Sequence, residues 1–288
     1  MKADVAVLIP AYNEEKTLAE ILTKVLALPF VAEVIVVDDG SADRTLEIAR
    51  SFADPRMKVF TQKNAGKSAA IRQAVSQATA PICIVQDADL EYDPEEIAGV
   101  VEPIQKDQAD VVYGSRFMVK KASRVLYYYH YVANKSLTAL SNMLTNLNMT
   151  DIETGYKAMR TPILKRLPFT SSGFGLEIEI TALVGQLGVR VYEVPISYYG
   201  RTYEEGKKIG MKDGIAAILY IFWYNLFAQH LSTKTRTCLR LVRQDLAALQ
   251  AAPKVAESAP SLPATSSSRK TKATGRPAAQ KNTRKLRS

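Results

Sequence analysis

Five short apolar runs alternate with helical patterns in the first half of the chain, and this alternation limits the fold more than any other feature. The runs are rich in β-branched residues and occupy positions 5–9, 33–37, 57–61, 82–86 and 110–114. Helical patterns separate them at about 14–27, 43–53, 67–78 and 94–106. Nearly continuous apolar runs are typical of parallel strands covered on both faces. The sequence therefore predicts the α/β class, with a mostly parallel, doubly wound sheet and helices on both faces.

A polar motif follows each of the five predicted strands. In chain order these motifs read PAYNEE, DDGS, QKNAGK, QDADLE and GSR. In doubly wound sheets ligands bind beyond the carboxyl ends of the strands. Random placement would scatter polar clusters over both edges of the sheet, so five clusters at one edge predict a single functional site.

Two carboxylates, Asp87 and Asp89, stand at the end of the fourth strand. Residues two apart in a strand point to the same face, so both side chains can present oxygen atoms to one ion. Oxygen ligands of this kind suit Mg²⁺ or Mn²⁺, and diphosphate oxygens can complete the coordination shell. The competing interpretation is a solvated acidic turn, because acidic turns are common on protein surfaces.

Three other motif residues each allow a structural and a functional interpretation. Asp39 either belongs to a turn before a helix or accepts hydrogen bonds from a base or ribose. Glu14 either stabilises the first turn of a helix or contributes to the site. Lys67 follows Gly66 at a predicted helix start, but the spacing does not match a phosphate loop, which requires glycine where Thr61 stands.

Taken together and in this order, the motifs resemble those of the family 2 glycosyltransferases, which have the Rossmann-like GT-A fold. The resemblance rests first on residues 9–15, 36–41, 64–74, 86–91 and 114–116. Within that family the chain resembles the polyprenyl-phosphate sugar synthases, such as the dolichol-phosphate mannose synthases. The second half supports this through residues 130–138, 148–160, 174–181 and 200–214. The resemblance covers about residues 5–225.

The resemblance implies a role for each matching residue on the side of the sugar donor. Those expected to hold the nucleotide-sugar are Pro10, Tyr12, Glu14, Asp39, Lys67, Asp87 and Arg201. Those expected to hold the divalent metal, Mg²⁺ or Mn²⁺, are Asp87 and Asp89, with Glu91 as a third ligand.

For the acceptor, the resemblance implies that Arg116 and Arg124 meet a phosphate, which a planar guanidinium can bind through two hydrogen bonds. These two arginines and Asp89 are the expected catalytic residues, together with Asp151 if a base is required. Asp151 can also be read as a turn acid. The close relatives place a serine or threonine after the second arginine, where this chain has Tyr127-Tyr128-Tyr129-His130.

Charge and hydropathy divide the rest of the chain. From Ser232 to Ser288 there are 13 Lys and Arg but 2 Asp and Glu, so the net charge of +9 belongs to this end. A nucleic-acid-binding domain would carry such charge on its folded face, so no nucleic acid is expected as a partner. We predict a GT-A domain at 1–205, a basic loop and interfacial helical region at 206–249, and a disordered basic Ala/Pro/Ser/Lys tail at 250–288.

The apolar run 215–224 is the predicted interfacial helix. It is shorter than the roughly 20 apolar residues of a spanning helix. Basic residues before and after it favour an anionic membrane surface as a partner: Lys207, Lys208, Lys212, Lys234, Arg236, Arg240 and Arg243. The alternative is a core helix packed on the sheet, since periodicity does not separate the two.

The sequence thus predicts inverting transfer of a hexose from a GDP- or UDP-sugar to a polyprenyl phosphate or another lipid-linked acceptor. We expect a cytoplasmic protein, peripheral on the inner face of the cell membrane, because no signal peptide is visible and Cys83 and Cys238 form no metal or redox spacing. One alternative is a glycosyltransferase acting on a saccharide or glycolipid hydroxyl in cell-envelope polysaccharide synthesis. Another is a nucleotide-binding scaffold without catalysis.

Overall fold

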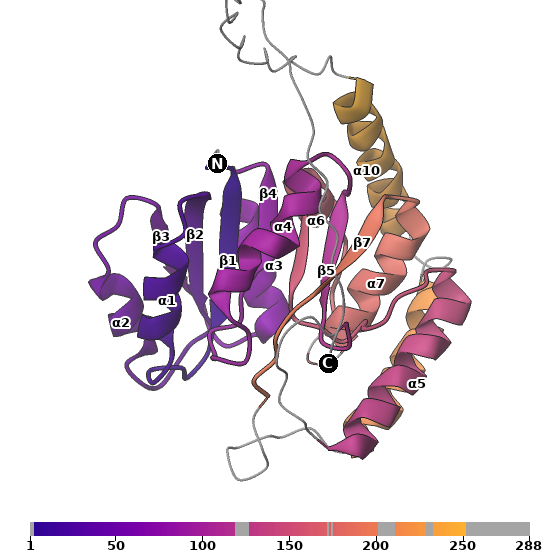
Figure 1. Cartoon of the computed structure of the whole chain (residues 1–288), viewed down its shortest axis with the longest axis horizontal. Helices are drawn as coiled ribbons and strands as arrows, with labels where there is room; N and C mark the ends of the chain where they lie inside the picture. Colours follow the sequence, from indigo (N-terminus) through magenta and orange to yellow (C-terminus); the bar gives the residue numbers. More distant parts are fainter. Residues whose placement is uncertain are drawn as a thin grey trace, which may run out of the picture. The chain divides into compact units, whose positions relative to one another are not determined.

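Seven strands form one sheet in the order β3-β2-β1-β4-β6-β5-β7 in the computed structural model (Figure 1). The structure describes residues 3–118, 127–171, 173, 175–200, 211–228 and 233–251. The strands are β1 (Val5–Ala11), β2 (Val31–Asp38), β3 (Met57–Thr61), β4 (Ile82–Val85), β5 (Val111–Ser115), β6 (Lys157–Arg160) and β7 (Val191–Pro195). This confirms the α/β class and the five strands predicted in the first half.

Six of the strands run parallel, and β6 alone runs antiparallel to its two neighbours, β4 and β5. The insertion of β6 reverses the direction twice, so β5 still points the same way as β4. The carboxyl ends of the other six strands therefore meet at one edge. This is the arrangement that the five polar motifs predicted.

Helices cover both faces of the sheet. The face carrying Ala6, Leu8 and Val85 packs against α3 (Lys67–Gln77), α6 (Thr161–Arg166) and α7 (Gly175–Leu187). The face carrying Val5, Val7 and Ile9 packs against α1 (Leu18–Leu26), α2 (Thr45–Ser51) and α4 (Ile97–Gln105), which follows the 3₁₀ turn η1 (Pro94–Glu96). Residues 5–9 are all fully buried. Because alternate residues of a strand point to opposite faces, burial on both faces explains the continuous apolar runs.

The remaining helices are α5 (Tyr128–Thr145), α8 (Met211–Phe222), the π-helical turn η2 (Trp223–Phe227) and α10 (Thr233–Ala251). Figure 1 shows α5 and α10 on the side of the molecule opposite α1 and α2. Residues Met1–Ala251 form one compact unit. The boundary predicted at 205 falls outside the described residues. Of the disordered tail predicted at 250–288, residues 250 and 251 instead form the end of α10, and the rest lies outside the described residues. Among the described residues, no helix is long and apolar enough to cross a membrane.

Helix α8 has two different faces, so both interpretations of the apolar run apply to it. Ala217 and Ile221 are buried in the core beside α7 and α5, and the Asn225 side chain donates to the Ile221 carbonyl at 2.8 Å. The opposite face of α8, continued by η2, is apolar and exposed, and it comprises Ile215, Ile218, Leu219, Phe222, Trp223, Leu226 and Phe227. Part of this helix is therefore core, and the rest is an uncovered apolar surface.

Helix α10 packs on the main unit through Val242 and Leu246. The Arg243 guanidinium donates to the Leu187 carbonyl at 3.4 Å, at the C-terminal end of α7, and Arg166 pairs with Asp245 at 2.7 Å. Arg243, one of the basic residues expected near an anionic leaflet, is exposed and also contacts the end of α7, and its place at a leaflet stays a prediction. Of the other basic residues expected there, Arg236 and Arg240 are exposed, whereas Lys207 and Lys208 lie outside the described residues.

Candidate active site

A cavity of about 420 Å³ opens at the carboxyl edge of the sheet. Seven of the predicted site residues line it: Pro10, Tyr12, Glu14, Asp39, Lys67, Asp87 and Asp89. They come from the end of β1, from the loops that follow β1, β2 and β4, and from the start of α3. The structure therefore brings together most of the residues expected to hold a sugar donor. Asp87 and Asp89 lie beyond the last residue of β4, Val85, and not within the strand as the sequence predicted. Arg124 and Arg201, which were expected to meet phosphates, lie outside the described residues.

Asp39 anchors the loop that leads into α3. Its carboxylate accepts hydrogen bonds from the Gln62 side chain at 2.6 Å and from the backbone N–H groups of Ala65 and Gly66 at 2.9 and 2.8 Å. Gly40 follows with φ +73°, and a Cβ atom there would lie 2.9 Å from the Asn64 nitrogen. The aspartate is thus buried against this loop, and the turn needs glycine because both its φ angle and the close approach exclude a side chain.

Glu14 and its neighbours join the loops after β1 and β2. The Glu14 backbone N–H donates to the Thr45 hydroxyl at 2.8 Å, and the Glu14 carboxylate accepts from Thr17 at 2.9 Å. Asn13 accepts from the Ala42 N–H at 2.8 Å and donates its own N–H to Ser41 at 3.0 Å. These cross-links hold the wall of the cavity on which Tyr12 stands half exposed.

Lys67 lies between two carboxylates inside the site. Its ammonium group is 2.7 Å from the Asp87 carboxylate and 3.6 Å from that of Glu177 on α7. Burial lowers the pKa of Lys67, but the two carboxylates outweigh that effect and hold the pKa above its usual range. The ammonium group of Lys67 therefore supplies a positive charge between the carboxylates of Asp87 and Glu177.

Two of the three carboxylates predicted to bind a divalent metal ion line the cavity. Asp87 and Asp89 both line the cavity and offer hard oxygen ligands. Glu91 accepts a hydrogen bond from the Tyr198 hydroxyl at 3.0 Å. In the part of the chain that the structure describes, no three His, Cys, Asp or Glu side chains gather closely enough to hold a metal. The two aspartates fit an ion whose shell is completed by ligand oxygens, and the third-ligand role of Glu91 stays a prediction.

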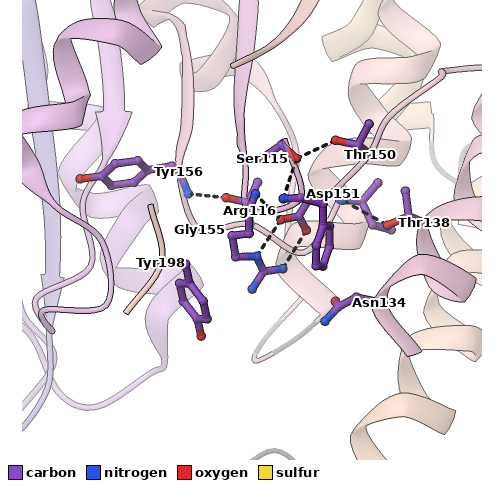
Figure 2. Close-up of polar contacts among 12 residues, drawn as sticks. Ser115, Arg116, Asn134, Thr138, Thr150, Asp151, Gly155, Tyr156 and Tyr198 are labelled. Carbon is purple, nitrogen blue, oxygen red and sulfur yellow. Dashed lines mark hydrogen bonds and ion pairs between the residues drawn. The ribbon is translucent and has the colours of Figure 1, made fainter. Parts of the chain in front are cut away.

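Arg116 and Asp151 form a buried, two-point ion pair (Figure 2). The Arg116 Nε and Nη2 atoms lie 2.7 Å from the two carboxylate oxygens of Asp151, and the Arg116 backbone N–H adds a third contact at 3.1 Å. Asp151 is fully buried. Burial opposes the charge on Arg116, yet the Asp151 carboxylate raises the pKa of Arg116 well above its usual range.

This pairing bears on the base role expected for Asp151. Both of its carboxylate oxygens accept hydrogen bonds from a permanent cation, which disfavours taking a proton from a substrate. The two hydrogen bonds hold the Arg116 guanidinium against Asp151, and the base role of Asp151 stays a prediction.

A carboxylate that the sequence reasoning missed holds the Asp151 loop in place. Glu193 on β7 accepts from the Thr150 N–H at 2.8 and 2.9 Å and from the Asp151 N–H at 3.1 Å. The Thr150 hydroxyl in turn lies 2.6 Å from that of Ser115, as Figure 2 shows. The only signal in the sequence was one acid in the run VRVYEVPISY at 189–198, a pattern typical of a strand. An acid in such a run is equally typical of an exposed strand residue.

A column of aromatic rings runs from the loop that follows β4 to Arg116. The Tyr156 and Tyr92 rings stack at 4.8 Å, Tyr92 meets Tyr198 at 5.4 Å, and the Arg116 guanidinium lies 5.1 Å from the Tyr198 ring centroid. Burial raises the pKa of Tyr92 to about 12, so its hydroxyl stays protonated and can donate hydrogen bonds. The column connects the loop that follows β4, which carries Tyr92, to the cation that follows β5.

A sequence profile of the family described as Glycosyl transferase family 2 matches residues 6–167, more than half of the chain. The chain belongs to glycosyltransferase family 2. The match contains Asp39, Asp87, Asp89, Arg116 and Asp151, whereas the supporting residues Glu177, Glu193 and Tyr198 lie beyond its end.

Curated relatives of this glycosyltransferase include enzymes named for polyprenyl phosphates. A dolichol-phosphate mannosyltransferase of Pyrococcus furiosus is 30% identical over 212 residues, 72% of this chain and 59% of that one. An undecaprenyl-phosphate mannosyltransferase of Micrococcus luteus is 29% identical over 234 residues, 76% of this chain and 93% of that one. The alignment spans less than two thirds of the Pyrococcus protein and 63% of the glycosyltransferase AglJ of Haloferax volcanii, so those proteins extend beyond it.

Among solved structures, a glucosyl-3-phosphoglycerate synthase from Mycobacterium tuberculosis resembles this glycosyltransferase with a TM-score of 0.60. The identity is 20%, and the alignment covers 76% of this chain and 79% of that one. That protein was crystallised with Mn²⁺, UDP-glucose and phosphoglyceric acid. At this identity the likeness shows the shared GT-A fold.

Proposed function

We propose that this glycosyltransferase moves a hexose from a GDP- or UDP-sugar to a polyprenyl phosphate with inversion at the anomeric carbon. The observation that carries the proposal is the arrangement of charges at the sheet edge. Carboxylates and Lys67 line the donor cavity, and Arg116 lies beyond them at the end of the aromatic column. The names of the relatives from Pyrococcus and Micrococcus support the acceptor class.

On the donor side, Asp87 and Asp89 would hold Mg²⁺ or Mn²⁺, which supplies Lewis-acid neutralisation of the departing diphosphate. Lys67 lies against Asp87 and is close enough to contribute a second positive charge to the diphosphate. Pro10 and Tyr12 form the wall against which the nucleoside rests. These residues bind and orient the donor, so that the anomeric carbon faces the Arg116 side of the cavity.

On the acceptor side, the reaction forms a bond between a phosphate oxygen and the anomeric carbon while the bond from that carbon to the diphosphate breaks. A lipid phosphate is already an anion near neutral pH, so alignment and electrostatic help suffice and no strong base is needed. The occupied carboxylate of Asp151 agrees with this chemistry. A saccharide hydroxyl would need a general base, and Asp151 is tied to Arg116. The polyprenyl phosphate is therefore favoured over the saccharide acceptor.

The exposed apolar face of α8 supports a peripheral position on a membrane. It presents Leu219 at 64% exposure, and η2 continues it with Trp223 at 49% exposure. Aromatic residues favour the headgroup level of a bilayer. Helix α5 contacts α8 and exposes Tyr128 and Tyr129. Together these helices would bring the Arg116 region to the depth at which a polyprenyl phosphate headgroup emerges.

A donor screen tests the proposed function. The full chain would be incubated with Mn²⁺ and radiolabelled UDP- and GDP-sugars, with a short polyprenyl phosphate or the matching polyprenyl alcohol as acceptor. We expect transfer to the phosphate and none to the alcohol. Transfer to a saccharide in preference to the phosphate would contradict the proposal.

A further inference from the structure

Lys135 on α5 lies beside Arg116 but outside the cavity residues described above. Its ammonium group is 5.1 Å from the centre of the Phe117 ring, and the Arg116 guanidinium carbon is 5.8 Å from the same centre. The two distances set an upper limit of about 11 Å between the cations. Phe117 therefore brings together a cation from the end of β5 and a cation from α5.

The two cations are bound to the same loop in different ways. Arg116 pairs with the Asp151 carboxylate, whereas Lys135 donates to the neighbouring Thr150 carbonyl at 3.2 Å. Among residues 3–118, 127–171 and the later described segments, no carboxylate forms an ion pair with Lys135. An ammonium group has three donors, so the Thr150 contact leaves two for a ligand or water.

The charges explain why Arg116 needs a second cation. Asp151 neutralises Arg116, and Glu193 adds another carboxylate next to the Thr150 and Asp151 backbone. A phosphate monoester carries about −1.5 to −2 charges at neutral pH. Its approach to the Arg116–Asp151 pair alone would bring it close to two carboxylates for one guanidinium. The nearby ammonium group of Lys157 is buried and already donates to the Ile152 and Thr154 carbonyls. Lys135, which stands on α5, supplies the additional positive charge.

We propose that Lys135 and Arg116 together bind the phosphate of the acceptor, with Lys135 providing the net positive charge. This inference rests on the proposed function, because it takes the acceptor to be a phosphate monoester. The lysine stem is flexible, so the ammonium can leave the Thr150 carbonyl and reach an incoming phosphate oxygen.

The surroundings of Lys135 favour a lipid phosphate over a free one. Tyr131, one helical turn earlier, packs edge-on against Phe117 at 5.2 Å and is 45% exposed. Tyr128 and Tyr129, earlier on the same helix, are among the most exposed aromatic residues described. A phosphate attached to an apolar chain can therefore reach Lys135 while its chain lies on this aromatic surface.

The charge can be removed while the local hydrogen bond is kept. Lys135→Gln retains a side-chain N–H for the Thr150 carbonyl but is neutral, and Lys135→Arg keeps the charge. Lys106→Gln, at an exposed lysine paired with Glu102, is the matched control. Initial rates of the full chain would be measured against a soluble short polyprenyl phosphate and, separately, against the nucleotide-sugar.

We expect Lys135→Gln to raise KM for the polyprenyl phosphate about ten- to a hundredfold, as for the loss of a charged hydrogen bond, with KM for the donor unchanged. Inorganic phosphate should compete with the acceptor, and its inhibition constant should rise by a similar factor. Lys135→Arg should restore most of the affinity, and Lys106→Gln should behave as the wild type.

Each other outcome has a definite meaning. An unchanged acceptor KM in Lys135→Gln, with the wild type active on polyprenyl phosphate, refutes the role of Lys135 and leaves the proposed function standing. A raised acceptor KM with unchanged inhibition by inorganic phosphate shows that Lys135 senses the lipid chain, which also refutes phosphate binding. A wild type that ignores polyprenyl phosphate refutes the proposed function itself. If Lys135→Gln does not fold, Lys135→Met in the same assays decides the question.

Discussion

Replacing Asp151 with asparagine tests whether this residue anchors Arg116 or acts as a base. Asparagine has nearly the same shape, but it carries no charge and offers one acceptor oxygen in place of two. Arg116, whose side chain is 13% exposed, would keep its charge and lose its only ion-pair partner among the described residues. Its Nη2 or Nε group would then face the new amide N–H₂.

The expected loss of stability follows from the burial of the pair. Removing one partner of a buried ion pair costs about 3–5 kcal/mol, and the retained oxygen places Asp151→Asn near the lower end, at about 3 kcal/mol. For a unit of this size, each kcal/mol lowers Tm by roughly 2–4 °C, so we expect a fall of about 6–12 °C. Turnover should also fall, because Arg116 loses its orientation.

Urea unfolding of the full chain measures this cost, and a double-mutant cycle with Arg116→Met isolates the pair. The double variant should be less destabilised than the sum of the single variants, by about 1–3 kcal/mol. Glu102→Gln, which breaks an exposed pair with Lys106, should leave the urea midpoint unchanged. If Asp151→Asn unfolds at the wild-type urea concentration but has lost turnover, Asp151 acts in the chemistry and the anchoring argument is wrong.

Four further changes test other parts of the site. Gly155→Ala should weaken Mn²⁺ binding in calorimetry with the fold intact, because the new Cβ would lie 2.7 Å from the Asp87 carboxylate; Gly99→Ala, with nothing within 4 Å, is its control. Asp89→Ala should abolish transfer while circular dichroism stays native, and full turnover in this variant or in excess chelator would disprove the metal role. Burial raises the pKa of Glu153 to about 8 from 4.5, so its protonated form stabilises the fold below pH 4.5 and this contribution is lost as the pH rises through 8. Glu153→Gln should therefore flatten the pH dependence of the unfolding free energy between about pH 5 and 8, and an unchanged slope in urea titrations would count against the burial argument. Leu219→Glu with Phe222→Glu should reduce sedimentation with anionic vesicles and leave nucleotide binding unchanged, since both side chains are exposed; a wild type that ignores vesicles would exclude the membrane surface.

Much of the site could be predicted from the sequence because its signals are local. A run such as residues 5–9 is apolar at every position, which marks a strand buried on both faces. The motif that follows each strand must then lie at the carboxyl edge, since parallel strands end together. Those two rules are enough to bring Asp39, Asp87 and Asp89 into one cavity.

The partners of the charged residues were decided by the tertiary structure. Asp151 and Arg116 are 35 positions apart in sequence, and Glu193 lies a further 42 positions beyond Asp151. No periodicity connects them, because Arg116 follows β5, Asp151 precedes β6 and Glu193 stands on β7, and these three strands become neighbours only in the folded sheet. Whether Asp151 would be a base or an anchor could therefore not be read from its motif.

Helix α8 also has properties that could be predicted from its sequence and properties that depend on its tertiary contacts. Its sequence determined that residues 215–224 form an apolar helix too short to span a bilayer, because composition and length are local properties. Which side of that helix is buried depends on α5 and α7, which pack against Ala217 and Ile221 and leave Leu219 and Phe222 uncovered. A helix that is apolar all round carries no periodic signal for its inner face, so only the packing of the neighbouring helices could separate the core face from the exposed one.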